Sequence, residues 1–148
     1  MLGAGALRGR LPLAVAVVAA IALVIIVAAG ALAGRDDTGP LRIDITIRDS
    51  HYDPPSITVP TGRPVTFVIH NTDPIDHEWI LGDAALHAIH RAGTEAVHVG
   101  RANALSIAAL ATVETTLTFA APRTDLTYVC HLPGHEAYGM VGTLIVTK

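Results

Sequence analysis

The sequence contains a single cysteine, Cys130, among 148 residues. One thiol cannot form an intramolecular disulfide, so a disulfide-stabilised scaffold is excluded. A dinuclear copper electron-transfer centre is also excluded, because it requires two cysteines. The thiol of Cys130 is therefore either free or bound to a metal, and a bound metal would explain why the chain keeps one unpaired cysteine.

An excess of positive charge is also lacking. Arg8 and Arg10 are the only charged residues before Gly34, so the remainder carries eight Lys/Arg against thirteen Asp/Glu, or −5 with neutral histidines. A nucleic-acid-binding domain would present a basic patch or stripe, so this balance argues against nucleic acid as a partner. A moderate negative charge suits docking to a basic or mixed surface on a protein partner.

Charge is absent altogether from residues 11–33, a run of 23 apolar or small residues. As a helix it would be about 34 Å long at about 1.5 Å per residue, enough to cross a hydrocarbon core of about 30 Å. The preceding arginines predict an anchor with its N-terminus inside and the rest of the chain outside. A signal peptide cleaved after Ala33 is the alternative, since Ala31-Leu32-Ala33 has the small-x-small pattern, but the run is long for one. No cysteine directly follows the run, which excludes a lipoprotein anchor. Both interpretations export the rest of the chain, either anchored to the membrane or free in the periplasm or medium.

Beyond a short polar linker over 34–40, residues 41–148 read as one all-β domain. Segments rich in Val, Ile and Thr are separated by Pro- and Gly-containing turns, such as 52–55 and 60–64. Seven or eight short strands in about 110 residues are typical of a β-sandwich. The predicted strands cover 41–47, 56–59, 65–69, 77–81, 115–119, 126–129 and 142–147.

The segment 128–142 carries the strongest functional signal. It holds Cys130, then His135 five residues later, then Met140 after five more. Thiolate, imidazole and a weak thioether are the donors of a mononuclear electron-transfer copper site, which is completed by a second histidine. Pro133 and Gly134 favour a turn that brings these donors to one point. Taken alone, each of these residues is more often an ordinary core or surface residue than a metal ligand. Their joint spacing on one loop predicts a copper ligand loop.

This pattern resembles the blue-copper cupredoxins, in particular plastocyanin- and azurin-like bacterial copper proteins. The resemblance covers residues 41–148 and implies a Greek-key β-sandwich with one copper ion. Its first ligand is a histidine shortly after a strand ending in Asn, which matches Asn71 and His77. The implied ligands are therefore His77, Cys130, His135 and Met140. Plastocyanin and azurin have Asn directly after the first histidine, whereas Glu78 stands here, which leaves open how the cysteine sulfur is hydrogen-bonded.

An insertion over 82–103 interrupts the strands. Residues 84–93 predict a short helix ended by Gly93, with His87 and His90 on one face and His98 nearby. A second metal site there is conceivable, but solvated surface histidines are expected. His131, directly after Cys130, forms a Cys-His pair like that of copper nitrite reductases. No second set of copper ligands is evident from the sequence, so His131 is expected to face solvent or brace the loop.

Together these features predict an exported one-electron carrier in which copper alternates between Cu(I) and Cu(II). The expected partners are an unidentified redox protein and, through the N-terminal helix, the membrane; no small-molecule substrate is expected. A copper-binding protein for storage, delivery or tolerance is the alternative. An enzyme is not expected, because neither a nucleophile–base pair nor a second copper set is evident.

Overall fold

The computed structural model describes residues 39–93 and 98–148. The predicted membrane or signal helix over 11–33 lies outside these residues, as does most of the linker. Within the described part, no helix is long and apolar enough to cross a membrane. The described chain forms one helix, α2 (Ala84–Arg91), and nine strands: β1 (Leu41–Arg48), β2 (His51–Asp53), β3 (Ser56–Pro60), β4 (Pro64–Asn71), β5 (His77–Gly82), β6 (Ala104–Ile107), β7 (Thr112–Thr118), β8 (Arg123–Val129) and β9 (Val141–Thr147).

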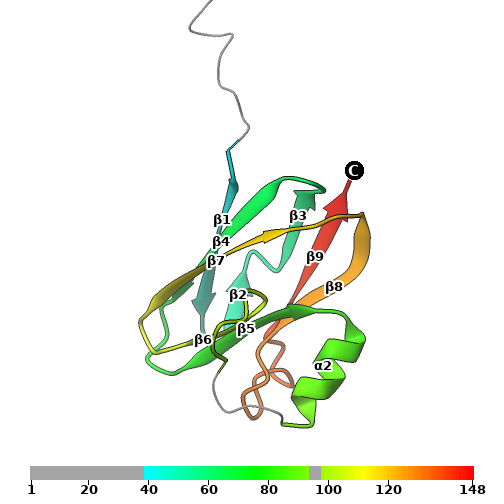
Figure 1. The fold of residues 1–148 in the computed structure, drawn as a ribbon. Helices are drawn as coiled ribbons and strands as arrows, with labels where there is room; N and C mark the ends of the chain where they lie inside the picture. The colour runs from blue at the N-terminus through cyan, green and yellow to red at the C-terminus, as the bar shows by residue number, and fades with distance from the viewer. Residues whose placement is uncertain (1–38, 94–97) are drawn as a thin grey trace, which may run out of the picture. The chain divides into compact units, whose positions relative to one another are not determined.

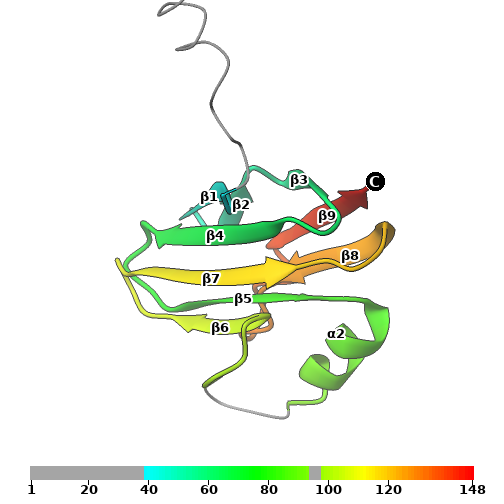
Figure 2. The same cartoon turned by 45° about the horizontal axis from the view of Figure 1, so that its top comes forward.

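The strands form two sheets, which confirms the predicted β-sandwich (Figure 1). One sheet has the order β2-β1-β4-β7 and the other the order β3-β9-β8-β5-β6. Strand β1 pairs in parallel with β4, and β3 pairs in parallel with β9, while the other neighbours are antiparallel. Figure 2 shows β4 and β7 of the first sheet side by side, with α2 beside β5 and outside both sheets.

Alternating residues of the strands fill the space between the sheets. In β1, Ile45 and Ile47 are fully buried, and in β9 Leu144 and Val146 are buried. Because successive side chains of a strand point to opposite faces, this alternation places one face of each sheet on the core. In residues 41–47 the sequence itself alternates apolar and polar residues, in agreement with this burial.

Three aromatic rings pack in the core next to β5. Trp79 is fully buried, with its ring centroid 5.2 Å from that of Phe67 and 6.3 Å from that of Tyr128. Aromatic rings at such separations pack favourably. Trp79 and Tyr128 therefore serve as packing residues of the core.

Two strands were not predicted. The segment 52–55 was expected to be a turn, yet Tyr52 lies in β2, pairs with Ile47 and is buried. Strand β6 follows directly after the predicted insertion and has only four residues, two of them buried. Both strands are too short to show a period-two pattern in the sequence, and their pairing depends on the neighbouring strand.

Helix α2 agrees with the prediction in position but not in exposure. The Asp83 side chain caps its N-terminus by accepting a hydrogen bond from the N–H of Leu86 at 3.1 Å, and Gly93 just beyond its end has φ +76°. The expectation of solvated histidines was wrong, because His87 and His90 are 2% and 8% exposed. They face β8 and the loop that follows it rather than solvent.

Candidate metal centre

Three of the four predicted ligands converge at one end of the sandwich. His77 begins β5, Cys130 directly follows β8, and His135 lies in the β8–β9 loop (residues 130–140). Their donor atoms all lie within 4.8 Å of one another. The Nδ1 atom of His135 is 3.2 Å from both His77 Nδ1 and Cys130 Sγ. Because β5 and β8 are hydrogen-bonded neighbours, the sheet itself bridges the long sequence separation between His77 and Cys130.

The β8–β9 loop is held in a compact shape by its own backbone. The N–H of His135 donates to Leu132 O at 3.1 Å, and the N–H of Tyr138 donates to Gly134 O at 3.0 Å. Gly134 has φ +87°, a conformation that glycine adopts at little cost. The predicted Pro-Gly turn therefore lies where the chain must reverse to bring His135 back toward Cys130.

Met140, the fourth predicted ligand, ends this loop. Its side chain is fully buried and belongs to the same core cluster as Cys130. Its N–H donates to His135 O at 3.0 Å, and its carbonyl accepts from the N–H of Cys130 at 3.3 Å. The backbone of Met140 is thus hydrogen-bonded to both His135 and Cys130, the two other predicted ligands of this loop.

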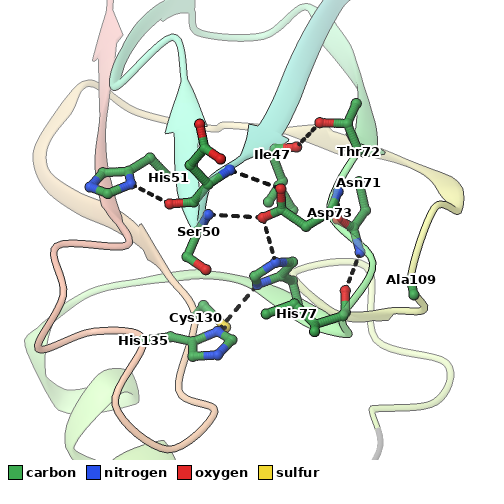
Figure 3. A network of polar contacts seen from close by, with 12 residues as sticks. Ile47, Ser50, His51, Asn71, Thr72, Asp73, His77, Ala109, Cys130 and His135 are labelled. Atoms are coloured by element: carbon green, nitrogen blue, oxygen red, sulfur yellow. Dashed lines mark hydrogen bonds and ion pairs between the residues drawn. The ribbon is translucent and has the colours of Figure 1, made fainter.

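Asp73, which no sequence pattern marks, fixes the His77 ring (Figure 3). Its Oδ2 atom lies 3.0 Å from His77 Nε2. The same carboxylate accepts hydrogen bonds from the N–H groups of Asp49 and Ser50, each at 2.8 Å. Burial favours a raised pKa for Asp73, but these hydrogen bonds and that from His77 outweigh it and lower the pKa. An ionised Asp73 can only accept, so His77 donates from Nε2 and its Nδ1 lone pair is left facing Cys130 and His135.

The segment between β4 and β5 is braced from the other side by Asn71, the strand-ending residue of the predicted motif. Its side-chain N–H group donates to the carbonyls of Ile75 at 2.8 Å and Ala108 at 2.9 Å. Its Oδ1 accepts from the N–H of Asp73 at 3.0 Å. Asn71 therefore positions both the residue that holds the His77 ring and the turn that leads into β5.

The Cys130 sulfur is fully buried and receives a backbone hydrogen bond. The N–H of Glu78 lies 3.3 Å from Cys130 Sγ. Burial raises the pKa of the Cys130 thiol to about 11, although hydrogen bonds from the N–H groups of Leu132 and Glu78 act in the opposite direction. The Glu78 backbone thus supplies a hydrogen bond to the sulfur, whatever side chain stands at this position. Tyr52 supports this segment by donating its hydroxyl to Glu78 O.

The side chain of Glu78 contacts a group of buried histidines. Its Oε2 accepts from the N–H of His131 at 3.2 Å, and its Oε1 lies 3.3 Å from His98 Nε2. His131 contacts His87, with His131 Nε2 and His87 Nδ1 2.9 Å apart. Burial lowers the pKa of both histidines, that of His131 to about 4. Through its contacts with Glu78 and His87, His131 braces the loop. Of the two expected roles, bracing the loop and facing solvent, the structure agrees with the first.

Further histidines lie next to His131 in the structure, although the sequence does not place them together. His87, His90, His98 and His131 come from three separate segments and are brought together by the fold. The sequence showed the i, i+3 spacing of His87 and His90, but it did not show that this face of α2 packs on the β8–β9 loop.

The donor geometry of the first site fits a copper ion. Metal-bound nitrogens and sulfurs at about 2.0–2.3 Å place neighbouring donors roughly 3–4 Å apart, which agrees with the two separations of 3.2 Å. One thiolate and two imidazoles, with a weak axial thioether, are the ligands of blue-copper centres. Carboxylates, the ligands of harder cations, take part only by holding the His77 ring.

Comparison with known proteins agrees with this chemistry. The model of the cupredoxin-like domain family matches residues 16–146. Two curated relatives are each described as "Copper-resistant cuproprotein CopI". The one from Pseudomonas aeruginosa is 29% identical over 136 residues, covering 70% of this chain and 75% of the relative. The one from Rubrivivax gelatinosus is 35% identical over 99 residues, covering 64% and 59%.

Solved structures include a similar fold. Auracyanin A, a "blue" copper protein from Chloroflexus aurantiacus, superimposes with a TM-score of 0.59 and 29% identity, covering 74% of this chain and all of auracyanin A. The family match spans most of the chain. The chain therefore belongs to the cupredoxin-like family, as its sequence indicated, and its cofactor is one copper ion.

Proposed function

We propose that this chain is an extracytoplasmic type 1 copper protein that carries single electrons, with His77, Cys130, His135 and Met140 as the copper ligands. The observation that supports this most directly is the convergence of His77, Cys130 and His135 within 4.8 Å. The bound copper would alternate between Cu(I) and Cu(II), and no bond of a substrate would be broken.

The protein's part in this function is to hold the ligands still. His77 is fixed by the Asp73 carboxylate, and the Cys130 sulfur by the Glu78 N–H. Interactions of this kind orient ligands and tune the metal that they bind. Ligands that move little between the two oxidation states keep the reorganisation energy of electron transfer low.

Exposure of the ligands suggests where electrons enter and leave. His77, Cys130 and Met140 are buried, whereas His135 is half-buried at the molecular surface. Tyr138, in the same loop, is 77% exposed. We place the docking face for the redox partner over the β8–β9 loop, around the His135 ring. Export of the domain rests on the apolar run 11–33, and we expect the domain outside the cytoplasmic membrane.

Copper tolerance is the second candidate function, and the descriptions of the two CopI relatives favour it. The two candidates differ in what the copper must do. A carrier needs a stable site with a reversible one-electron couple, whereas a delivery or storage site needs to release its ion.

A redox titration of the copper-loaded full chain tests the proposal. A carrier is expected to bleach on reduction and recover its colour on oxidation over many cycles without losing copper. Met140→Leu should shift the midpoint potential and keep the colour, since the axial ligand tunes the potential. Loss of copper on each reduction, or binding of Cu(I) alone without colour, would instead favour delivery or storage. A gene deletion that reduces growth only at high copper would support tolerance.

A further inference from the structure

A second group of buried imidazoles lies next to the copper ligands. Helix α2 supplies His87 and His90, and the β8–β9 loop supplies His131. His87 and His90 are 2% and 8% exposed, and the His131 side chain is 5% exposed. His98, which precedes β6, packs on His90 with ring centroids 5.1 Å apart. Figure 1 shows α2 beside the β8–β9 loop, which is why these segments meet.

Each of the three inner rings has one nitrogen directed at an oxygen that can only accept a hydrogen bond. His87 Nε2 lies 3.1 Å from Thr127 O, and His90 Nδ1 lies 2.9 Å from Leu86 O. His131 Nδ1 lies 3.3 Å from Glu136 Oε2, which also accepts a hydrogen bond from Arg91 Nε at 3.0 Å. These three nitrogens therefore carry the protons.

The other nitrogen of each ring then has an unshared lone pair directed into the protein. His87 Nδ1 and His131 Nε2 lie 2.9 Å apart, and with the protons on the other ring nitrogens their two lone pairs face each other. His90 Nε2 is buried and has no hydrogen-bond partner among the described residues. A buried polar atom without a partner is destabilising. A metal ion bound by these nitrogens would satisfy all three lone pairs.

The first site shows the same arrangement. There, His77 Nε2 is directed at the Asp73 carboxylate, and His77 Nδ1 faces His135 Nδ1 at 3.2 Å. Histidine ligands of metals almost always donate their other ring N–H to a carboxylate or carbonyl. With metal–nitrogen distances of about 2.0–2.1 Å, two nitrogens bound at a right angle lie about 2.9 Å apart. This is the separation of the His87 and His131 nitrogens.

We propose that His87, His90 and His131 form a second metal site, which binds Cu(II). Imidazole nitrogens suit copper, zinc, iron and nickel, and Cu(II) binds most tightly among the divalent ions of this series. The site goes beyond the proposed electron-carrier function and does not depend on it. It would be joined to the first site through consecutive residues, because Cys130 and His131 are neighbours in the chain.

The two sites differ in how far they are preformed. Among residues 39–93 and 98–148, the one group of three donors already within 4.8 Å of one another is His77, Cys130 and His135. The His90 ring stacks on His131 with centroids 5.7 Å apart, and its Nε2 joins the other two nitrogens only after a movement of the side chain. The second site is therefore expected to fill after the first and more weakly.

The test is a copper titration of the full chain, purified without a polyhistidine tag and freed of loosely bound metal by gel filtration. Metal analysis should find two copper ions per wild-type chain at saturation. The His87→Gln/His90→Gln variant should bind one and keep the visible colour of the first site. His70→Gln, which replaces a surface histidine of β4 that pairs with Asp44, is the matched control and should bind two.

Electron paramagnetic resonance gives a second measurement that does not depend on variants of the cluster. The wild type at saturation should show two Cu(II) signals, the thiolate signal of the first site and a second, colourless signal with hyperfine coupling from imidazole nitrogens. One copper per wild-type chain, or two in the His87→Gln/His90→Gln variant, would overturn the second site. A proton shared by His87 and His131 would then explain their short contact. Neither result affects the first site, whose own test is the visible spectrum.

Discussion

The Nε2 atom of His77 lies 3.0 Å from Asp73 Oδ2, and the same carboxylate accepts two backbone N–H groups from the turn between β1 and β2. The turn residues Asp49 and Ser50 both have positive φ, 52° and 57°. Successive N–H groups in such a turn form a concave site for an anion. The ring of a copper ligand is thus held, through one carboxylate, by a part of the chain that is distant in sequence.

Replacing this carboxylate should weaken copper binding. We expect Asp73→Asn to lower copper affinity by about 10–100-fold, the usual effect of losing a residue that orients a metal ligand. Competition with a chelator of known affinity measures the change. Asp44→Asn is the matched control, since Asp44 also contacts a histidine, His70 at 3.0 Å, but at the surface. Equal affinities for Asp73→Asn and wild type would show that the His77 ring needs no such support.

Glu78 should affect the reduction potential. Its buried carboxyl raises the pKa of Cys130 through its charge, secondary to burial. A nearby negative charge favours the more positive Cu(II) state, so Glu78→Gln should raise the midpoint potential. The backbone hydrogen bond to Cys130 Sγ is retained in this variant, so the colour should persist. Glu114→Gln, exposed on β7 of the other sheet, should leave the potential unchanged; a lower potential in Glu78→Gln would contradict this account.

Copper binding should depend on pH. The pKa of the metal-free Cys130 thiol is raised to about 11 by burial, so the thiol is protonated throughout the neutral range. Binding as a thiolate must release that proton. Burial lowers the pKa of His77, so protons compete little with copper for this ring near neutral pH. Apparent affinity should therefore rise about tenfold per pH unit between pH 6.5 and 8, following proton linkage. Calorimetry in buffers of different ionisation enthalpy measures the proton count, and no proton release would mean that Cys130 is not a ligand.

Gly142 tests the packing behind the copper loop. It lies opposite Tyr128 in the β8–β9 pair, and an added Cβ would meet the Tyr128 ring at 2.1 Å. Overpacking of this kind costs about 1–3 kcal/mol, so Gly142→Ala should lower the free energy of unfolding by about that amount in a urea titration. Gly39→Ala, where a Cβ meets nothing within 4 Å, is the control and should have little effect.

The sequence predicted the parts of the site that depend on local patterns. Cys130, His135 and Met140 share one loop, and β9, which follows it, shows period-two burial, so both the loop and this strand could be predicted from the sequence. His77 required the family resemblance, because only the pairing of β5 with β8 brings it to Cys130.

Other features depend on tertiary contacts that no local pattern reveals. Asp73 is one acidic residue among thirteen, and nothing in its neighbours marks it as the support of His77. Histidines that are three apart on a short helix look the same whether that face meets solvent or protein. Their burial against the β8–β9 loop depends on where α2 packs, and that could not be read from the insertion alone.

The most direct test of the copper centre is the visible absorption spectrum of the copper-loaded full chain, compared with that of Cys130→Ser. An intense thiolate-to-copper band in the wild type, absent from Cys130→Ser and bleached reversibly by a one-electron reductant, is the predicted result. The same band in Cys130→Ser, or none in the copper-loaded wild type, would contradict the ligand assignment.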